Sequence, residues 1–203
     1  MAEFLIPRRL LIAGGAALLA LPARAQGAPA AVVERLHAAL LDAMRQAQRL
    51  GVRGRYERLA PVIQASFDLP AMARISVGPP WTRMSPQEQQ AVVQAFSEWS
   101  IATYASRFDG FAGEQFVTDG TAPTQSGDQM VRTRLVRPNA EPVALNYLMR
   151  QSGGGWRIVD VYLAGNISEL ASRRSEFSAV VREGGGERLA AELRRRTQEL
   201  MRG

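Results

Sequence analysis

Apolar side chains recur at helical spacing through the first part of the chain. From Val32 to Leu50 they return every three or four residues, which is the period of one helix face. Gly51 and Gly54 supply a stop signal after this run. A second helix is predicted over Tyr56–Phe67, and a third begins at Asp68, which is followed by proline in the first turn.

A clear helix start lies at residues 85–88, where the sequence SPQE forms a capping box with proline at the first helical position. The helix that follows runs to about Phe108. On a wheel of roughly 100° per residue, its apolar side chains cover well over half of the circumference. A helix on a simple two-layer core needs a narrower stripe. We therefore expect this helix to be enclosed on more than one side or to border an internal cavity.

After Gly110 the pattern changes to alternation, which is typical of strands. It predicts strands over residues 114–118, 129–137, 142–150 and 156–163, and their short, turn-rich links imply an antiparallel meander. Both faces carry apolar side chains, so helices are expected to cover much of both. A helix through Val181, a break at three glycines and a final arginine-rich helix complete the pattern. It indicates one α+β domain with four strands and about six helices.

The first 25 residues have the layout of a secretory signal peptide. Arg8 and Arg9 precede an apolar run of roughly a dozen residues, whereas a membrane-spanning helix needs about 20. Small residues around Arg24 predict cleavage after Ala25. The paired arginines fit a twin-arginine (Tat) signal as well as an ordinary Sec signal, so both export routes stay open. We expect residues 26–203 to form the exported domain.

Composition removes many kinds of chemistry. The 203 residues are 46% hydrophobic and 22% charged, enough to build a core. There is no cysteine, one histidine (His37), and all 25 basic residues are arginine. Disulfides, cysteine nucleophiles, multi-histidine metal centres and lysine chemistry are therefore excluded. His37 lies beside an apolar stripe, where a packed or solvated ring is the expected role. We expect no cofactor and no metal site.

The chain is basic, with a formal net charge of +6. Removal of residues 1–25 leaves 178 residues with 22 arginines and 18 acids. An exported basic protein meets anionic membrane surfaces, so transient membrane contact is one expectation, and solvated arginines without a partner are the alternative. The aromatic residues do not follow an RNA-recognition pattern, and we expect no nucleic-acid partner.

One acid interrupts an apolar strand. Asp160 stands among large apolar residues, and a buried carboxylate needs partners, by default an arginine or backbone amides. A small exported hydrolase that uses paired carboxylates is the alternative that this position leaves open. The glycine triplets at 153–155 and 184–186 lack the spacing of a nucleotide-binding loop and are interpreted as a turn and a helix break.

Ordered sequence segments resemble the MlaC family of periplasmic lipid carriers, also called the toluene-tolerance auxiliary family. They are RISVG at 74–78, SPQEQ at 85–89, WRIVDV at 156–161 and RSEF at 174–177, and the resemblance spans about residues 32–200. FDLPAMAR at 67–74 and YASRFDG at 104–110 look closer to the HpnM branch, which is associated with hopanoid export. One departure is GNIS at 165–168, where the family has a turn like Glu-Gly-Val-Ser.

The resemblance implies a curved antiparallel sheet and surrounding helices that enclose a hydrophobic pocket. It also implies a non-enzymatic carrier for a phospholipid or hopanoid. Its expected partners are an inner-membrane transporter complex and an outer-membrane lipoprotein or channel. A periplasmic scaffold with a filled core is a further alternative. With the wide apolar arc and the two-faced sheet, we predict a lipid pocket lined by nine residues: Phe67, Met72, Ile75, Phe96, Trp99, Leu145, Tyr147, Val161 and Leu163.

Overall fold

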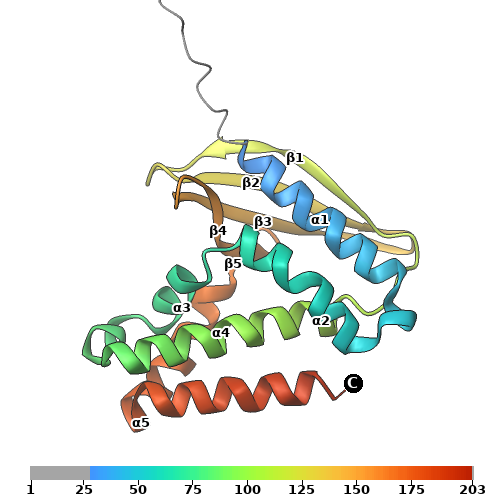
Figure 1. Cartoon of the computed structure of the whole chain (residues 1–203). Helices are drawn as coiled ribbons and strands as arrows, with labels where there is room; N and C mark the ends of the chain where they lie inside the picture. The colour runs from blue at the N-terminus through green and yellow to red at the C-terminus, as the bar shows by residue number, and fades with distance from the viewer. Residues whose placement is uncertain (1–27, 203) are drawn as a thin grey trace, which may run out of the picture.

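Residues 28–202 are described in a computed structural model, in which helices pack against an antiparallel sheet (Figure 1). The expected α+β class is confirmed. The predicted signal peptide, residues 1–25, lies outside the described residues, as do the first two residues of the expected domain. None of the described helices combines the length and the apolar character needed to cross a membrane.

The sheet has five antiparallel strands in chain order. They are β1 (Gln115–Pro123), β2 (Gln129–Arg137), β3 (Ala140–Ser152), β4 (Gly155–Leu163) and β5 (Ile167–Ser168). The prediction of four strands is therefore wrong by one. The additional strand, β5, pairs with the end of β4 through Ser168 opposite Tyr162. Because it contains only two residues, it shows no alternation by which a strand is recognised.

Five α-helices and one 3-10 helix occur within residues 28–202. They are α1 (Pro29–Arg45), α2 (Ala47–Ser66), α3 (Leu69–Val77), η1 (Pro79–Arg83), α4 (Pro86–Arg107) and α5 (Glu169–Leu200). The prediction of about six helices is corrected, since the last two form one element, α5. The predicted break is a kink at Gly184 and Gly185, after which the helix resumes at once.

Glycine also bends the chain near the start. The predicted stop at Gly51 is a kink inside α2, with φ of 60°, whereas α1 ends earlier, at Arg45. A positive φ is readily available to glycine, which explains why the bend falls there. The apolar period runs across both helices, so periodicity alone did not separate them.

The predicted helix starts are confirmed by their caps. The hydroxyl of Ser85 accepts a hydrogen bond from the backbone N–H of Glu88, and the Glu88 carboxylate accepts one from the N–H of Ser85. Asp68 caps α3 by accepting from the N–H of Ala71. These local bonds satisfy N–H groups that have no partner inside the helix.

Helix α4 is the central helix of the lower half of Figure 1, where it runs between the sheet side and α5. It packs against α2, α3 and α5. Its buried residues include Val92, Phe96, Trp99 and Ile101. The expectation from its wide apolar arc, enclosure on more than one side, is confirmed.

The two faces of the sheet differ. Val131, Tyr147 and Val161 pair across β2, β3 and β4 and are buried. In the neighbouring row Arg132 is exposed, and its partner across the strands, Asn146, is only half-buried. The expectation that helices cover much of both faces fails for this row, where polar side chains alternate with the buried apolar ones.

Candidate functional site

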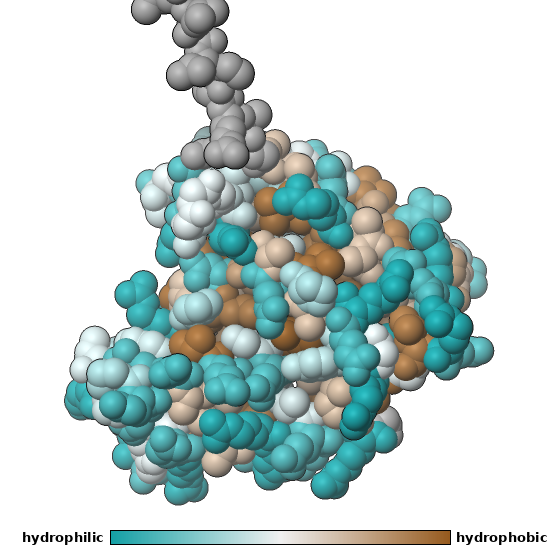
Figure 2. All heavy atoms as spheres, in the orientation of Figure 1, coloured by the Kyte–Doolittle hydropathy of each residue, from teal (hydrophilic) through white to brown (hydrophobic). Residues whose placement is uncertain are grey.

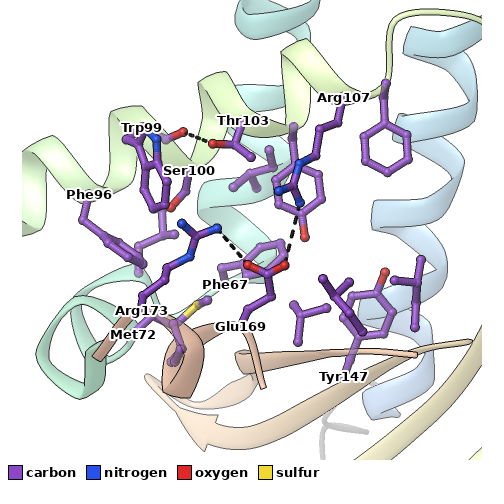
Figure 3. A pocket seen from close by; sticks show the side chains of 18 residues that line it. Phe67, Met72, Phe96, Trp99, Ser100, Thr103, Arg107, Tyr147, Glu169 and Arg173 are labelled. Atoms are coloured by element: carbon purple, nitrogen blue, oxygen red, sulfur yellow. Dashed lines mark hydrogen bonds and ion pairs between the residues drawn. The ribbon is translucent and has the colours of Figure 1, made fainter. Parts of the chain in front are cut away.

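A cavity lies between the helices and strands β3 and β4, with a volume of about 120 Å³. Figure 3 shows its lining side chains converging from α3, α4, α5 and the sheet. In the orientation of Figure 1, apolar atoms gather in a recess between the sheet half and the helical half (Figure 2). The lining is formed by Ile63, Phe67, Leu69, Met72, Phe96, Trp99, Ser100, Thr103, Tyr104, Arg107, Phe108, Leu145, Tyr147, Val161, Leu163, Glu169, Leu170 and Arg173.

Eight of the nine residues predicted for a lipid pocket line this cavity. They are Phe67, Met72, Phe96, Trp99, Leu145, Tyr147, Val161 and Leu163. Ile75 is not among the lining residues; it lies on α3 and packs, half-buried, against the core. Phe67 precedes α3, whereas Met72 and Ile75 lie within it. Periodicity alone does not show which of the three side chains faces the cavity.

Six rings form a continuous series, here called the aromatic chain: Phe67, Tyr104, Phe108, Phe116, His37 and Tyr147. Successive ring centroids are 5.6, 5.8, 6.4, 3.9 and 5.3 Å apart. Separations of this size are typical of attractive ring contacts. Phe67 and Tyr147, the two ends of the aromatic chain, both line the cavity. The aromatic chain therefore joins α1, α4 and the sheet into one wall.

His37 is a packed core residue rather than an exposed one. It is 4% exposed, and its Nε2 lies 2.9 Å from the hydroxyl of Tyr147. Burial lowers the pKa of His37 from 6.5 to about 4, since desolvation disfavours the charged ring. Burial also raises the pKa of Tyr147 well above its ordinary value. At neutral pH this pair is therefore uncharged.

Three charged residues at the edge of the cavity are here called the charged rim: Arg107, Glu169 and Arg173. A nitrogen of Arg173 donates to Oε2 of Glu169 at 2.8 Å, and Nη1 of Arg107 lies 3.7 Å from Oε1 (Figure 3). Arg107 has a side chain 59% exposed, against 20% for the other two. It is the one cavity-lining residue of the described chain that is classed as exposed, so the cavity opens beside it.

Two hydroxyl groups on the cavity lining have no hydrogen-bond partner within residues 28–202. They belong to Ser100 and Tyr104, both of α4. Burial raises the pKa of Tyr104, and the nearby charge of Glu169 raises it further. In contrast, the hydroxyl of Thr103 donates to the carbonyl of Trp99. The lining thus presents two free polar groups within a mostly apolar surface.

Sequence reasoning missed ten lining residues, and four of them show which could have been found and which could not. Tyr104 and Phe108 belong to the apolar arc of α4, so the helical wheel contained the signal for them. Glu169 and Arg173 begin α5 and carry no apolar signal. Their place on the cavity depends on how α5 meets the sheet, which sequence spacing does not reveal.

Asp160 has a structural role in this fold. One of its oxygens accepts from the backbone N–H groups of Val161 and Leu170, at 2.8 and 3.3 Å, and the other accepts from the hydroxyl of Ser168. Burial raises the pKa of Asp160, while these three hydrogen bonds oppose that shift. This matches the default interpretation of a buried carboxylate held by backbone amides. No cluster of three metal-ligating side chains occurs within residues 28–202.

Known proteins share the sequence pattern and the fold of this chain. The family model described as MlaC protein matches residues 34–195. A solved structure from Ralstonia solanacearum, a phospholipid-binding protein in complex with a phospholipid, superposes with a TM-score of 0.74 at 23% identity. The match covers 86% of this chain and 99% of that one, which shows a shared fold. No curated protein matches the chain. The family match extends over most of the sequence, and the chain therefore belongs to the MlaC family.

Proposed function

We propose that this protein binds a phospholipid or a hopanoid in the periplasm and carries it between the inner and outer membranes without catalysing a reaction. The observation that carries the proposal is the apolar cavity with charged residues at its opening. An acyl chain or a polycyclic body would lie against Phe67, Leu145 and Val161, and the polar head would stay at the charged rim. Family membership and the phospholipid-bound structural neighbour support a phospholipid as the ligand.

Burial of the hydrocarbon provides the binding energy. Moving hydrocarbon from water into an apolar site is worth about 0.8 kcal/mol per CH₂ group, so a chain of about 16 carbons gains roughly 12 kcal/mol before costs. This gain is available to offset imperfect packing around the lipid. The proposal includes export of the protein to the periplasm. It also includes an inner-membrane transporter complex and an outer-membrane lipoprotein or channel, with which the protein exchanges its lipid.

The cavity is smaller than a lipid. Its volume of about 120 Å³ compares with an engineered cavity of ~150 Å³ that binds benzene. A whole acyl chain therefore requires the helices and the sheet to separate. We expect the lipid-bound form to have α4 displaced from β3 and β4, and the present structure to be the closed form.

Mass spectrometry of an organic extract of the purified native protein tests the proposal directly. The expected result is a lipid present at near one molecule per protein, whose mass also separates a phospholipid from a hopanoid. A filled-core scaffold or a hydrolase would release no stoichiometric lipid. An extract free of lipid, together with no capture from vesicles, contradicts the proposal.

Two variants tie the lipid to this cavity. Leu145→Glu places a charge on the apolar lining and is expected to abolish lipid co-purification. Ser100→Trp fills the cavity from α4 without removing a hydrogen bond and is expected to lower the lipid content strongly. Gln94→Trp is the matched control, because Gln94 is exposed on the same helix and does not line the cavity. Circular dichroism checks that each variant is folded.

A further inference from the structure

The charged rim is unevenly paired. Oε2 of Glu169 is within hydrogen-bond distance of Arg173, whereas Oε1 is 3.7 Å from the nearest nitrogen of Arg107. A separation of 3.7 Å is an ion-pair contact but not a hydrogen bond. Oε1 of Glu169 and the Arg107 guanidinium are thus an acceptor and a donor that each have bonding capacity left. Both border the opening of the cavity.

Arg173 is held in place from two sides. Its guanidinium carbon lies 4.2 Å above the centroid of the Trp99 ring while its nitrogen donates to Glu169. A cation over an aromatic face is attracted to the ring, which fixes this side chain. Arg107 has no such support and is 59% exposed. The rim therefore combines a well-supported Glu169–Arg173 pair with one exposed, loosely paired cation.

This arrangement matches a headgroup that carries both signs of charge. We propose, building on the proposed function, that the charged rim selects zwitterionic phospholipids with a primary ammonium group: the phosphate binds Arg107 and the ammonium binds Oε1 of Glu169. Arginine is well suited to phosphate, and a carboxylate forms strong charge-assisted hydrogen bonds with an ammonium group. Both spare groups of the rim are then satisfied at once.

A purely anionic headgroup satisfies only half of the rim. Its phosphate would bind Arg107 equally well, but it has no cation for Glu169. In both classes the phosphate lies close to the carboxylate and is repelled by it, but only the zwitterionic headgroup brings an ammonium group that offsets this repulsion. Glu169 is the residue that distinguishes the two classes, whereas Arg107 serves both.

Lipid capture from mixed vesicles tests this selection. Purified protein stripped of lipid is incubated with vesicles of dioleoyl phosphatidylethanolamine and dioleoyl phosphatidylglycerol in equal amounts, then re-isolated and extracted. Mass spectrometry quantifies both lipids. We expect phosphatidylethanolamine to be enriched over the vesicle ratio. Glu169→Gln should lower this enrichment about fivefold. Arg107→Ala should lower capture of both lipids.

Glu176→Gln is the matched control. Glu176 lies on the same helix, is exposed and does not line the cavity, and the substitution changes the net charge by the same amount. Capture in the vesicle ratio by the unmodified protein would overturn the selection, as would an equal loss of enrichment in both Glu variants. Capture of neither lipid would also overturn the selection, and the proposed function itself fails only if the organic extract of the native protein is free of lipid as well.

Discussion

The aromatic chain and the charged rim border the same cavity and differ in almost every physical respect. The aromatic chain contains no ionised group at neutral pH, and its His37 and Tyr147 are nearly inaccessible to solvent. The charged rim consists of ion pairs, one partner of which is 59% exposed. Removal of a buried ring costs folding energy, whereas removal of an exposed charge costs little. We therefore expect the stability of the fold to depend on the aromatic chain and, under our proposal, the choice of ligand to depend on the charged rim.

The largest effect is expected for Phe67→Ala, which removes a ring that is 4% exposed at one end of the aromatic chain. Loss of a buried phenylalanine costs about 3–5 kcal/mol of unfolding free energy. Urea unfolding measures this cost. Phe111→Ala is the control, since Phe111 is 42% exposed and contacts only Arg45 by a ring interaction. A loss of less than about 1 kcal/mol in Phe67→Ala would contradict the structural role of the aromatic chain.

His37 is expected to lower the unfolding free energy by about 3 kcal/mol as the pH falls from 6.5 to 4. Its pKa is 6.5 unfolded and about 4 folded, so above pH 6.5 the ring is neutral in both states and contributes no pH dependence. Between pH 6.5 and 4 the unfolded chain binds a proton that the folded protein does not, and stability falls. Unfolding free energies of the natural protein and of His37→Gln at pH 7.5 and 4.5 isolate this loss. Equal pH dependence of the two proteins would show that His37 is not buried as described.

Replacement of the two cavity tyrosines by phenylalanine is expected to change the unfolding free energy by amounts that differ by about 1–2 kcal/mol. Tyr147→Phe removes the partner of His37 and leaves a buried ring nitrogen unpaired. Tyr104→Phe removes a hydroxyl without a partner among the described residues and should change stability by less than about 0.5 kcal/mol. Parallel urea titrations compare the two. Similar losses in both variants would mean that the Tyr104 hydroxyl is also bonded.

The smallest stability effect is expected for Arg107→Ala. Its ion pair spans 3.7 Å and its side chain is 59% exposed, so the unfolding free energy should change by less than about 0.5 kcal/mol. Thermal unfolding of lipid-free protein checks this. Combined with weaker lipid capture, an unchanged Tm would separate the rim from the aromatic chain most sharply. A large fall in Tm would place Arg107 among the structural residues instead.

Contacts between residues close together in the sequence were largely predictable, whereas contacts between residues far apart were not. The caps at Asp68 and Ser85 were predictable because their partners lie three residues away. The apolar arc of α4 indicated enclosure on more than one side or a bordering cavity, because its width exceeds what one contact surface needs. His37 and Tyr147 are 110 residues apart, and no spacing rule joins them. The charged rim was equally hard to predict, since all five strands separate Arg107 from Glu169 in the sequence.

The three hydrogen bonds to Asp160 also bear on how the molecule moves. This carboxylate ties β4 at Val161 to the first turn of α5 at Leu170, and both residues line the cavity. The strand and the beginning of α5 are thus held together by hydrogen bonds. Under the proposed function, we therefore expect β4 and the beginning of α5 to keep their relative position while a lipid enters between them and α4.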